Sequence, residues 1–64
     1  MNIPNCYDIL NLNKENITKK KLRNAYYKQA LKYHPDKNPD TDTTEQFQEI
    51  NIAYERLVVY HGFD

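Results

Sequence analysis

Apolar residues recur along the chain at the spacing of amphipathic helices, and no stretch alternates with the period of two that a half-buried strand requires. From Asn5 to Leu12 the apolar positions predict a short helix of one to two turns. A polar loop is expected over residues 13–16. The periodicity therefore favours a helical chain whose first helix is much shorter than the others.

The second predicted helix has well-marked ends and one apolar face. Thr18 is a favourable N-cap residue, and Pro35 disfavours the α conformation at the residue before it, so the helix is expected to end near Tyr33. Its inward face is formed by Leu22, Ala25, Tyr26, Ala30 and Tyr33. Gln29 lies in the same stripe. Because a buried amide needs hydrogen-bond partners, we expect Gln29 at the edge of the core or bonded to a loop backbone.

The third predicted helix begins at Asp42 or Thr43, where Thr43 and Gln46 have the spacing of a capping box. It continues to about Tyr60, and Gly62 is a natural C-terminal stop. Its inner face is formed by Phe47, Ile50, Ala53, Tyr54, Leu57 and Val58. Two long helices joined by a loop of about nine residues bury both apolar faces when they lie antiparallel. The predicted fold is therefore all-α, with the short first helix covering an antiparallel helical hairpin.

Size and composition limit the function classes. With 64 residues we expect one domain over 1–64, with a small core and no room for a deep active site. The single cysteine, Cys6, excludes an intrachain disulfide framework, and with only two histidines we expect no metal site and no cofactor. The sequence has no leader pattern and no membrane-spanning apolar run. We therefore expect a cytoplasmic monomer that does not contact a membrane.

Charge is balanced overall but unevenly distributed. Nine basic and nine acidic residues give a net charge of zero, which on its own argues against an electrostatic partner. Most of the basic residues, however, are gathered in one segment: Lys19, Lys20, Lys21, Arg23, Lys28, Lys32 and Lys37. Acidic residues dominate the segment 40–56. The second helix thus has a basic outward face that includes Tyr27 and Leu31, which suits either a solvated surface or a binding patch.

The tripeptide His34-Pro35-Asp36 follows the basic helix. It has an ordinary structural explanation, because a histidine suits the negative end of a helix, proline stops the helix and aspartate favours a turn. That explanation leaves open why an imidazole, a rigid ring and a carboxylate are presented together on an exposed tip beside a basic face.

At this point the sequence resembles the J-domain of DnaJ-like co-chaperones over nearly the whole chain. The resemblance rests on Tyr7-Asp8-Ile9-Leu10, Ala25-Tyr26, Ala30-Leu31-Lys32-Tyr33, His34-Pro35-Asp36-Lys37-Asn38-Pro39, Phe47, Glu49-Ile50-Asn51, Ala53-Tyr54-Glu55 and Leu57. The His-Pro-Asp triplet is highly specific when it lies between two helices patterned in this way. Tyr27 departs from the family, which usually has a basic residue there, and Gln29 stands where the family usually has Leu or Met. The usual fourth helix is missing or reduced to residues 59–64.

The resemblance implies a co-chaperone module that is not an enzyme. It would bind a DnaK-type chaperone, one of the seventy-kilodalton heat-shock ATPases, in its ATP-bound state, and its His-Pro-Asp loop would promote ATP hydrolysis. The expected chaperone-binding residues are His34, Pro35, Asp36, Arg23, Tyr26, Tyr27, Lys28, Lys32 and Lys37. Boundary residues such as Tyr26 are expected to serve both the core and the partner.

Three other interpretations stay open. The chain could be a J-like protein-interaction module without ATPase stimulation, as the departures at Tyr27 and Gln29 allow. A nucleic-acid-binding helix is opposed by a sequence pI of about 6.7 and by the acidic third helix, so we expect no nucleic-acid partner. His34 and Asp36 as the acid-base pair of a hydrolase would lack an evident nucleophile and pocket.

Overall fold

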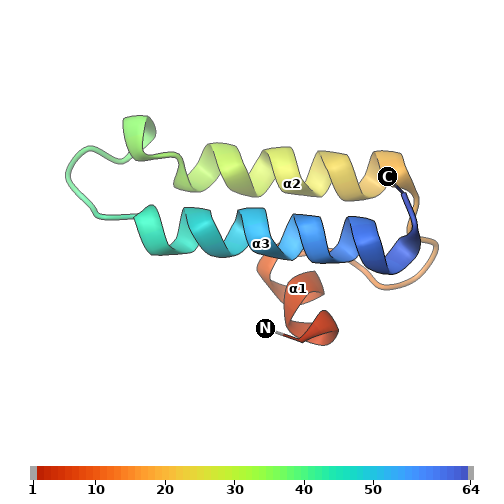
Figure 1. Cartoon of the computed structure of the whole chain (residues 1–64). Coiled ribbons are helices and arrows are strands. Elements are labelled where there is room, and N and C mark those ends of the chain that lie inside the picture. Colours follow the sequence, from red (N-terminus) through yellow and green to blue (C-terminus); the bar gives the residue numbers. More distant parts are fainter. Residues whose placement is uncertain (1, 64) are drawn as a thin grey trace.

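The computed structural model describes residues 2–63, and within that range it contains helices and turns but no strand. The elements are α1 (Ile3–Ile9), α2 (Lys19–Tyr33), the short 3-10 turn η1 (Pro35–Lys37) and α3 (Thr44–His61). α2 and α3 run antiparallel side by side, η1 lies in the loop at one end of this hairpin, and α1 packs against α3 (Figure 1). The predicted all-α hairpin with a short first helix is confirmed. No fourth helix follows α3 within these residues.

The limits of α2 follow the signals in the sequence. Thr18 Oγ1 accepts the backbone N–H of Lys21 at 3.1 Å and so caps the first turn. At the other end His34 adopts an extended backbone (ψ 132°), as expected for a residue that precedes proline. Both predicted ends of this helix are therefore correct.

The predicted limits of α1 are wrong, because the helix begins earlier and ends earlier than Asn5–Leu12. Asn2 is the N-cap, its side chain accepting the N–H of Asn5 at 2.9 Å, and Pro4 lies in the first turn, where a missing N–H costs nothing. Asn11 then adopts a left-handed conformation (φ 52°), which ends the helical run. Asn2 and Pro4 are the start signals that the apolar pattern alone overlooks.

α3 starts one residue later than the range predicted for it, and its capping box does not form. The hydroxyl of Thr43 makes no capping bond, because it donates to the carbonyl of Tyr33 at 2.6 Å. Asp42 serves the start of the helix instead, its Oδ1 accepting the N–H of Thr44 at 3.0 Å. At the far end Gly62 has φ 69°, so the predicted glycine stop is confirmed.

The core lies where all three helices meet. Its buried apolar side chains are Cys6, Tyr7, Leu10, Leu22, Ile50, Ala53 and Leu57. Phe47, predicted for the inner face of α3, is half-buried and lies outside this cluster, so that assignment is wrong. Gln29 is half-buried at the rim of the core, in line with its expected position. Cys6 and Tyr7 of α1, together with its C-cap residue Leu10, belong to this buried set, which ties the short helix to the hairpin.

Candidate functional site

His34, Pro35 and Asp36 lie at the tip of the hairpin, where α2 gives way to η1 (Figure 1). The backbone N–H of Asp36 donates to Nδ1 of His34 at 3.2 Å, so the neutral imidazole carries its proton on Nε2. The side chain of His34 is 45% exposed and that of Asp36 is 91% exposed. The turn therefore fixes the imidazole while leaving the carboxylate in solvent.

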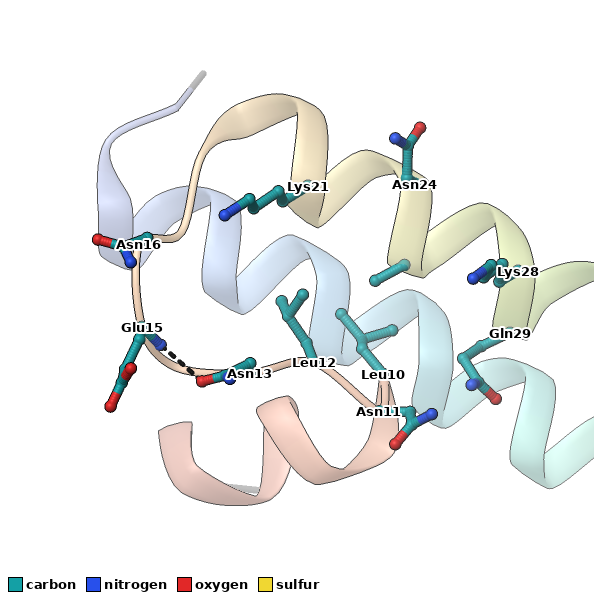
Figure 2. Close-up of a pocket in the computed structure, with 11 residues that line it drawn as sticks. Leu10, Asn11, Leu12, Asn13, Glu15, Asn16, Lys21, Asn24, Lys28 and Gln29 are labelled. Atoms are coloured by element: carbon teal, nitrogen blue, oxygen red, sulfur yellow. Dashed lines mark hydrogen bonds between the residues drawn. The ribbon is translucent and has the colours of Figure 1, made fainter.

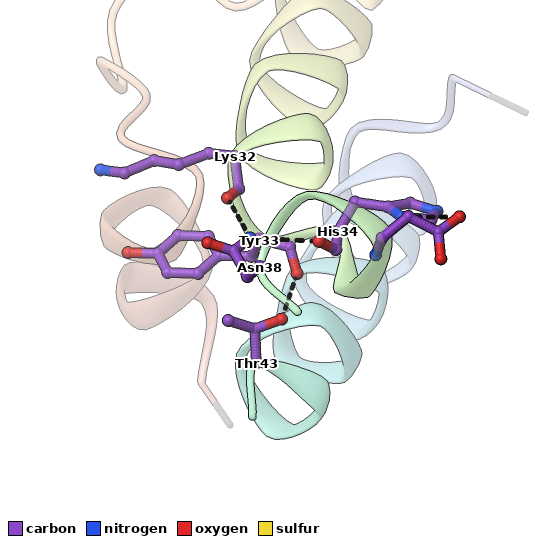
Figure 3. A network of polar contacts seen from close by, with 6 residues as sticks. Lys32, Tyr33, His34, Asn38 and Thr43 are labelled. Carbon is purple, nitrogen blue, oxygen red and sulfur yellow. Dashed lines mark hydrogen bonds and ion pairs between the residues drawn. The ribbon is translucent and has the colours of Figure 1, made fainter. Parts of the chain in front are cut away.

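Two loop side chains satisfy the carbonyl groups at the end of α2. Nδ2 of Asn38 donates to the carbonyl oxygens of Lys32 at 3.0 Å and His34 at 3.1 Å, and Oγ1 of Thr43 donates to that of Tyr33 (Figure 3). Carbonyl groups in the last turn of a helix lack partners within the helix. Here the two loop side chains donate hydrogen bonds to three consecutive carbonyl groups. These bonds anchor the His-Pro-Asp turn to the end of α2.

The imidazole of His34 also rests on α3. Its ring meets the ring of Phe47 edge-on, with the centroids 5.4 Å apart and the planes at 76°. Edge-to-face pairs of this kind contribute about 0.5–1.5 kcal/mol beyond the area they bury. Phe47 is therefore a residue of the tip, and its ring holds the imidazole of His34 against α3.

On one side of α2, three tyrosine rings lie next to one another: Tyr54 of α3, then Tyr26 and Tyr27 of α2. The ring of Tyr26 stacks on Tyr54 with centroids 4.4 Å apart, and its hydroxyl donates to Oδ1 of Asn51 at 2.8 Å. Next to it the exposed Tyr27 accepts a bond from Nε of Arg23 at 3.3 Å, and the guanidinium lies 5.5 Å from the centroid of the Tyr27 ring. The hydroxyl of Tyr27 raises the pKa of the Arg23 guanidinium by bonding to its charged form. Tyr26 thus belongs to the hairpin interface, while Arg23 and Tyr27 form one exposed unit.

The other side of α2 borders the loop that follows α1. Lys28, Lys21 and Asn24 line a groove of about 460 Å³ between α2 and this loop (Figure 2). Lys32 lies further along, with its Nζ 5.4 Å from the ring centroid of Tyr33. Lys28 and Lys32 are therefore separated by the width of the helix from the unit formed by Arg23 and Tyr27.

The structure brings together some of the sequence-predicted site residues but not all of them. His34, Pro35, Asp36 and Lys37 form the tip, while the α2 residues are divided between its two sides. Sequence reasoning missed the supporting roles of Asn38 and Thr43. The nearest signal in the sequence is the pair Asn38-Pro39, which is typical of turns.

The side chains of His34 and Asp36 are not joined by a hydrogen bond in this structure. Nδ1 of His34 lies 3.8 Å from Oδ2 of Asp36, which exceeds the reach of a hydrogen bond. Among residues 2–63, no three His, Cys, Asp or Glu side chains are grouped so that they could hold a metal ion. Over the same range none of the helices combines the length and apolarity needed to cross a membrane.

Comparison with known proteins agrees with this geometry. Residues 5–59 match the DnaJ domain family. The chain is 50% identical over 52 residues to the chaperone protein DnaJ of Chlorobium phaeobacteroides, a match that covers 80% of this chain and 13% of that protein. It is 51% identical over 53 residues to the chaperone protein DnaJ of Ehrlichia ruminantium, covering 81% of this chain and 14% of that protein. No solved structure matches.

The matched region includes α2, the tip and most of α3. It spans only 13–14% of the length of these relatives, so it corresponds to one domain of a much longer protein in each of them. On the family match and on identities of about half of the aligned residues, this chain belongs to the DnaJ domain family.

Proposed function

We propose that this chain is a co-chaperone module that binds a DnaK-type chaperone and stimulates its ATP hydrolysis. The observation that carries the proposal is the anchored tip, in which His34, Pro35 and Asp36 are exposed to a partner while Asn38 and Phe47 hold the turn in place. A preorganised turn loses little conformational entropy on binding. The membership of the DnaJ domain family supports the same conclusion.

The proposed action is allosteric, with no bond made or broken by this chain. The exposed carboxylate of Asp36 can accept charge-assisted hydrogen bonds from an arginine of the chaperone, and Nε2 of His34 can donate to an acceptor beside it. Stimulation requires that these contacts be stronger in the hydrolysis-competent state of the chaperone than in its resting state. The tip then shifts the population of the chaperone towards the competent state.

The basic helix would bring the two proteins together. α2 contains six Lys and Arg residues and no acidic residue. A face of this kind attracts an acidic surface and raises the association rate, an effect that salt weakens. Docking is therefore expected to be salt-sensitive. The expected cytoplasmic location and monomeric state stay predictions.

A single-turnover ATPase assay with a purified DnaK-type chaperone tests this proposal. His34→Gln is expected to abolish stimulation while lowering the free energy of unfolding by less than about 3 kcal/mol, because the side chain contributes one edge-to-face contact and one turn bond, each worth up to about 1.5 kcal/mol. His61→Gln, which alters the histidine at the opposite end of the hairpin, is the matched control and keeps full stimulation.

Two results would contradict the proposal. Full stimulation by His34→Gln would show that the tip does not act on the chaperone. Binding of the unaltered chain to the chaperone without any change in ATP hydrolysis would favour an interaction module instead, the alternative that the departures at Tyr27 and Gln29 leave open.

A further inference from the structure

The outer face of α3 carries an apolar groove in the half of the helix away from the tip. Ile52 is 42%, Val59 72% and Tyr60 63% exposed. The groove, of about 520 Å³, is lined by one residue of α1 and five of α3: Ile3, Ile52, Glu55, Arg56, Val59 and Tyr60. We propose that two copies of the chain pair through this groove, α3 against α3, around a two-fold axis. The groove is separate from the tip, so the inference does not depend on the proposed function.

Four of the lining residues form one row along α3. Positions 52, 55, 56 and 59 have the spacing i, i+3, i+4 and i+7, which places them on one face of a helix. All four side chains are exposed. Ile52 and Val59 form the apolar ends of the row, and Glu55 and Arg56 lie between them. Reversing the direction of the helix exchanges the acid and the base and leaves an apolar residue at each end.

This order makes the row complementary to a second copy of itself. In an antiparallel pair centred between residues 55 and 56, Ile52 of each copy lies opposite Val59 of the other, and Glu55 lies opposite Arg56. A two-fold axis repeats each of these contacts. Sliding one helix by about a turn places Ile52 opposite Glu55, or Arg56 opposite Val59, and covering a charge with an apolar side chain is costly. The row therefore favours a single register.

The two charged side chains of the row are available to a partner. Within residues 2–63 the structure has one ion pair, which joins His34 and Asp36 at the tip. Glu55 and Arg56 can therefore form two carboxylate-guanidinium pairs across the axis without breaking an ion pair of these residues in either copy. Charge pairs at the edge of an interface mainly determine orientation and register. The affinity is expected to come from the apolar ends of the row.

The size of the face indicates a weak dimer. A standard interface buries about 800 Å² on each partner, whereas this face offers three exposed apolar side chains per copy. Small interfaces are typical of transient association. We therefore expect dimers between about 0.1 and 1 mM and monomers in the low micromolar range. The monomer predicted from the sequence then describes the dilute protein.

Sedimentation equilibrium of the full chain tests the pairing in physiological salt, from about 20 μM to about 1 mM. The average mass is expected to rise from 7.7 kDa towards twice that value. Glu55→Arg and Arg56→Glu each place like charges opposite one another, so each is expected to weaken association at least about tenfold. An equimolar mixture of the two variants restores both opposite-charge pairs. It is expected to associate within about threefold of the unaltered chain.

Two more variants complete the design. Ile52→Ser removes an apolar end of the row and is expected to weaken association to a similar extent. Glu45→Arg makes the same change of charge as Glu55→Arg at an exposed site about 15 Å away along α3, so it is the matched control and keeps association. Circular dichroism verifies that each variant has the helix content of the unaltered chain.

Four results would overturn the inference. A mass that stays at 7.7 kDa at the highest concentration excludes the pairing and leaves the groove to a partner other than a second copy. Undiminished association of Ile52→Ser shows that the copies meet through another face. A mixture of Glu55→Arg and Arg56→Glu that stays monomeric shows that the register is wrong. Equal losses in Glu45→Arg and Glu55→Arg show that net charge, and not this pair, controls association.

Discussion

Replacement of Thr43 by valine tests the link that closes the tip of the hairpin. Thr43 is only 6% exposed, and its hydroxyl donates to the carbonyl of Tyr33, the last residue of α2, at 2.6 Å. Valine has nearly the same shape, so Thr43→Val removes the hydrogen bond without opening a cavity. The carbonyl of Tyr33 then loses its partner at a site that the loop partly shields from water.

The expected cost follows from that loss. Leaving a buried acceptor unsatisfied costs about 1–3 kcal/mol. A domain of 64 residues has a total stability of roughly 3–10 kcal/mol, so this one bond is a substantial part of it. The melting temperature is expected to fall by about 4–8 °C for each kcal/mol lost.

Thr43→Ser is the matched control, because serine keeps the hydroxyl and removes one buried methyl group, worth about 0.8 kcal/mol. Urea unfolding followed by circular dichroism gives the free energy of both variants, and amide hydrogen exchange reports opening of residues 33–38. Valine is expected to destabilise the domain more than serine. The opposite order would show that Thr43 acts through packing, and the proposed role of its hydroxyl would be wrong.

Two further predictions concern the core and the dependence on pH. Leu57→Ala, at a fully buried side chain, is expected to remove about 2–5 kcal/mol in urea unfolding, whereas Val59→Ala is expected to change stability by less than about 0.5 kcal/mol; equal effects would contradict the assigned core. Burial raises the pKa of the Tyr7 hydroxyl above its ordinary 10.0 and that of the Cys6 thiol above 9.0. Because the folded state holds these protons more tightly, this stability is complete below about pH 9 and is lost as the pH rises through and beyond 10. A stability profile of Tyr7→Phe that falls as steeply as the unaltered chain above pH 10 would refute this role of Tyr7.

The sequence predicts the hairpin well because the decisive signals are local. Thr18 and Pro35 determine the ends of α2 through contacts within a few residues, and Gly62 ends α3 in the same way. The apolar faces also require antiparallel packing whatever the details of the loop. The predicted start of α1 is two residues too late, because its apolar pattern is too short to show where the helix begins and the N-cap is Asn2.

The tip is less predictable because its contacts join residues that come close only after α2 and α3 pair. The sequence predicts that Thr43 caps its own helix, but the folded hairpin places the carbonyl of Tyr33, ten residues earlier, within reach of its hydroxyl. The apolarity of Phe47 predicts a core position, but one turn into α3 its ring packs edge-on against the ring of His34. In both cases the side chain contacts a residue that is distant in the sequence, and local sequence preferences do not show that contact.

Net charge is a poor guide to partners for a domain of this shape. The domain measures 36 × 21 × 19 Å, whereas screening in physiological salt acts over about 8 Å. A partner that approaches the outward face of α2 meets Arg23, Lys28 and Lys32 within that distance. On its lysine side, however, α2 has acidic neighbours: Glu15 lines the same groove as Lys28, and Asp8 and Glu49 line the groove that Lys32 borders. The overall balance of nine acids and nine bases therefore does not describe the field over α2, and the salt dependence of docking is expected to reflect the residues close to this face, its acidic neighbours included.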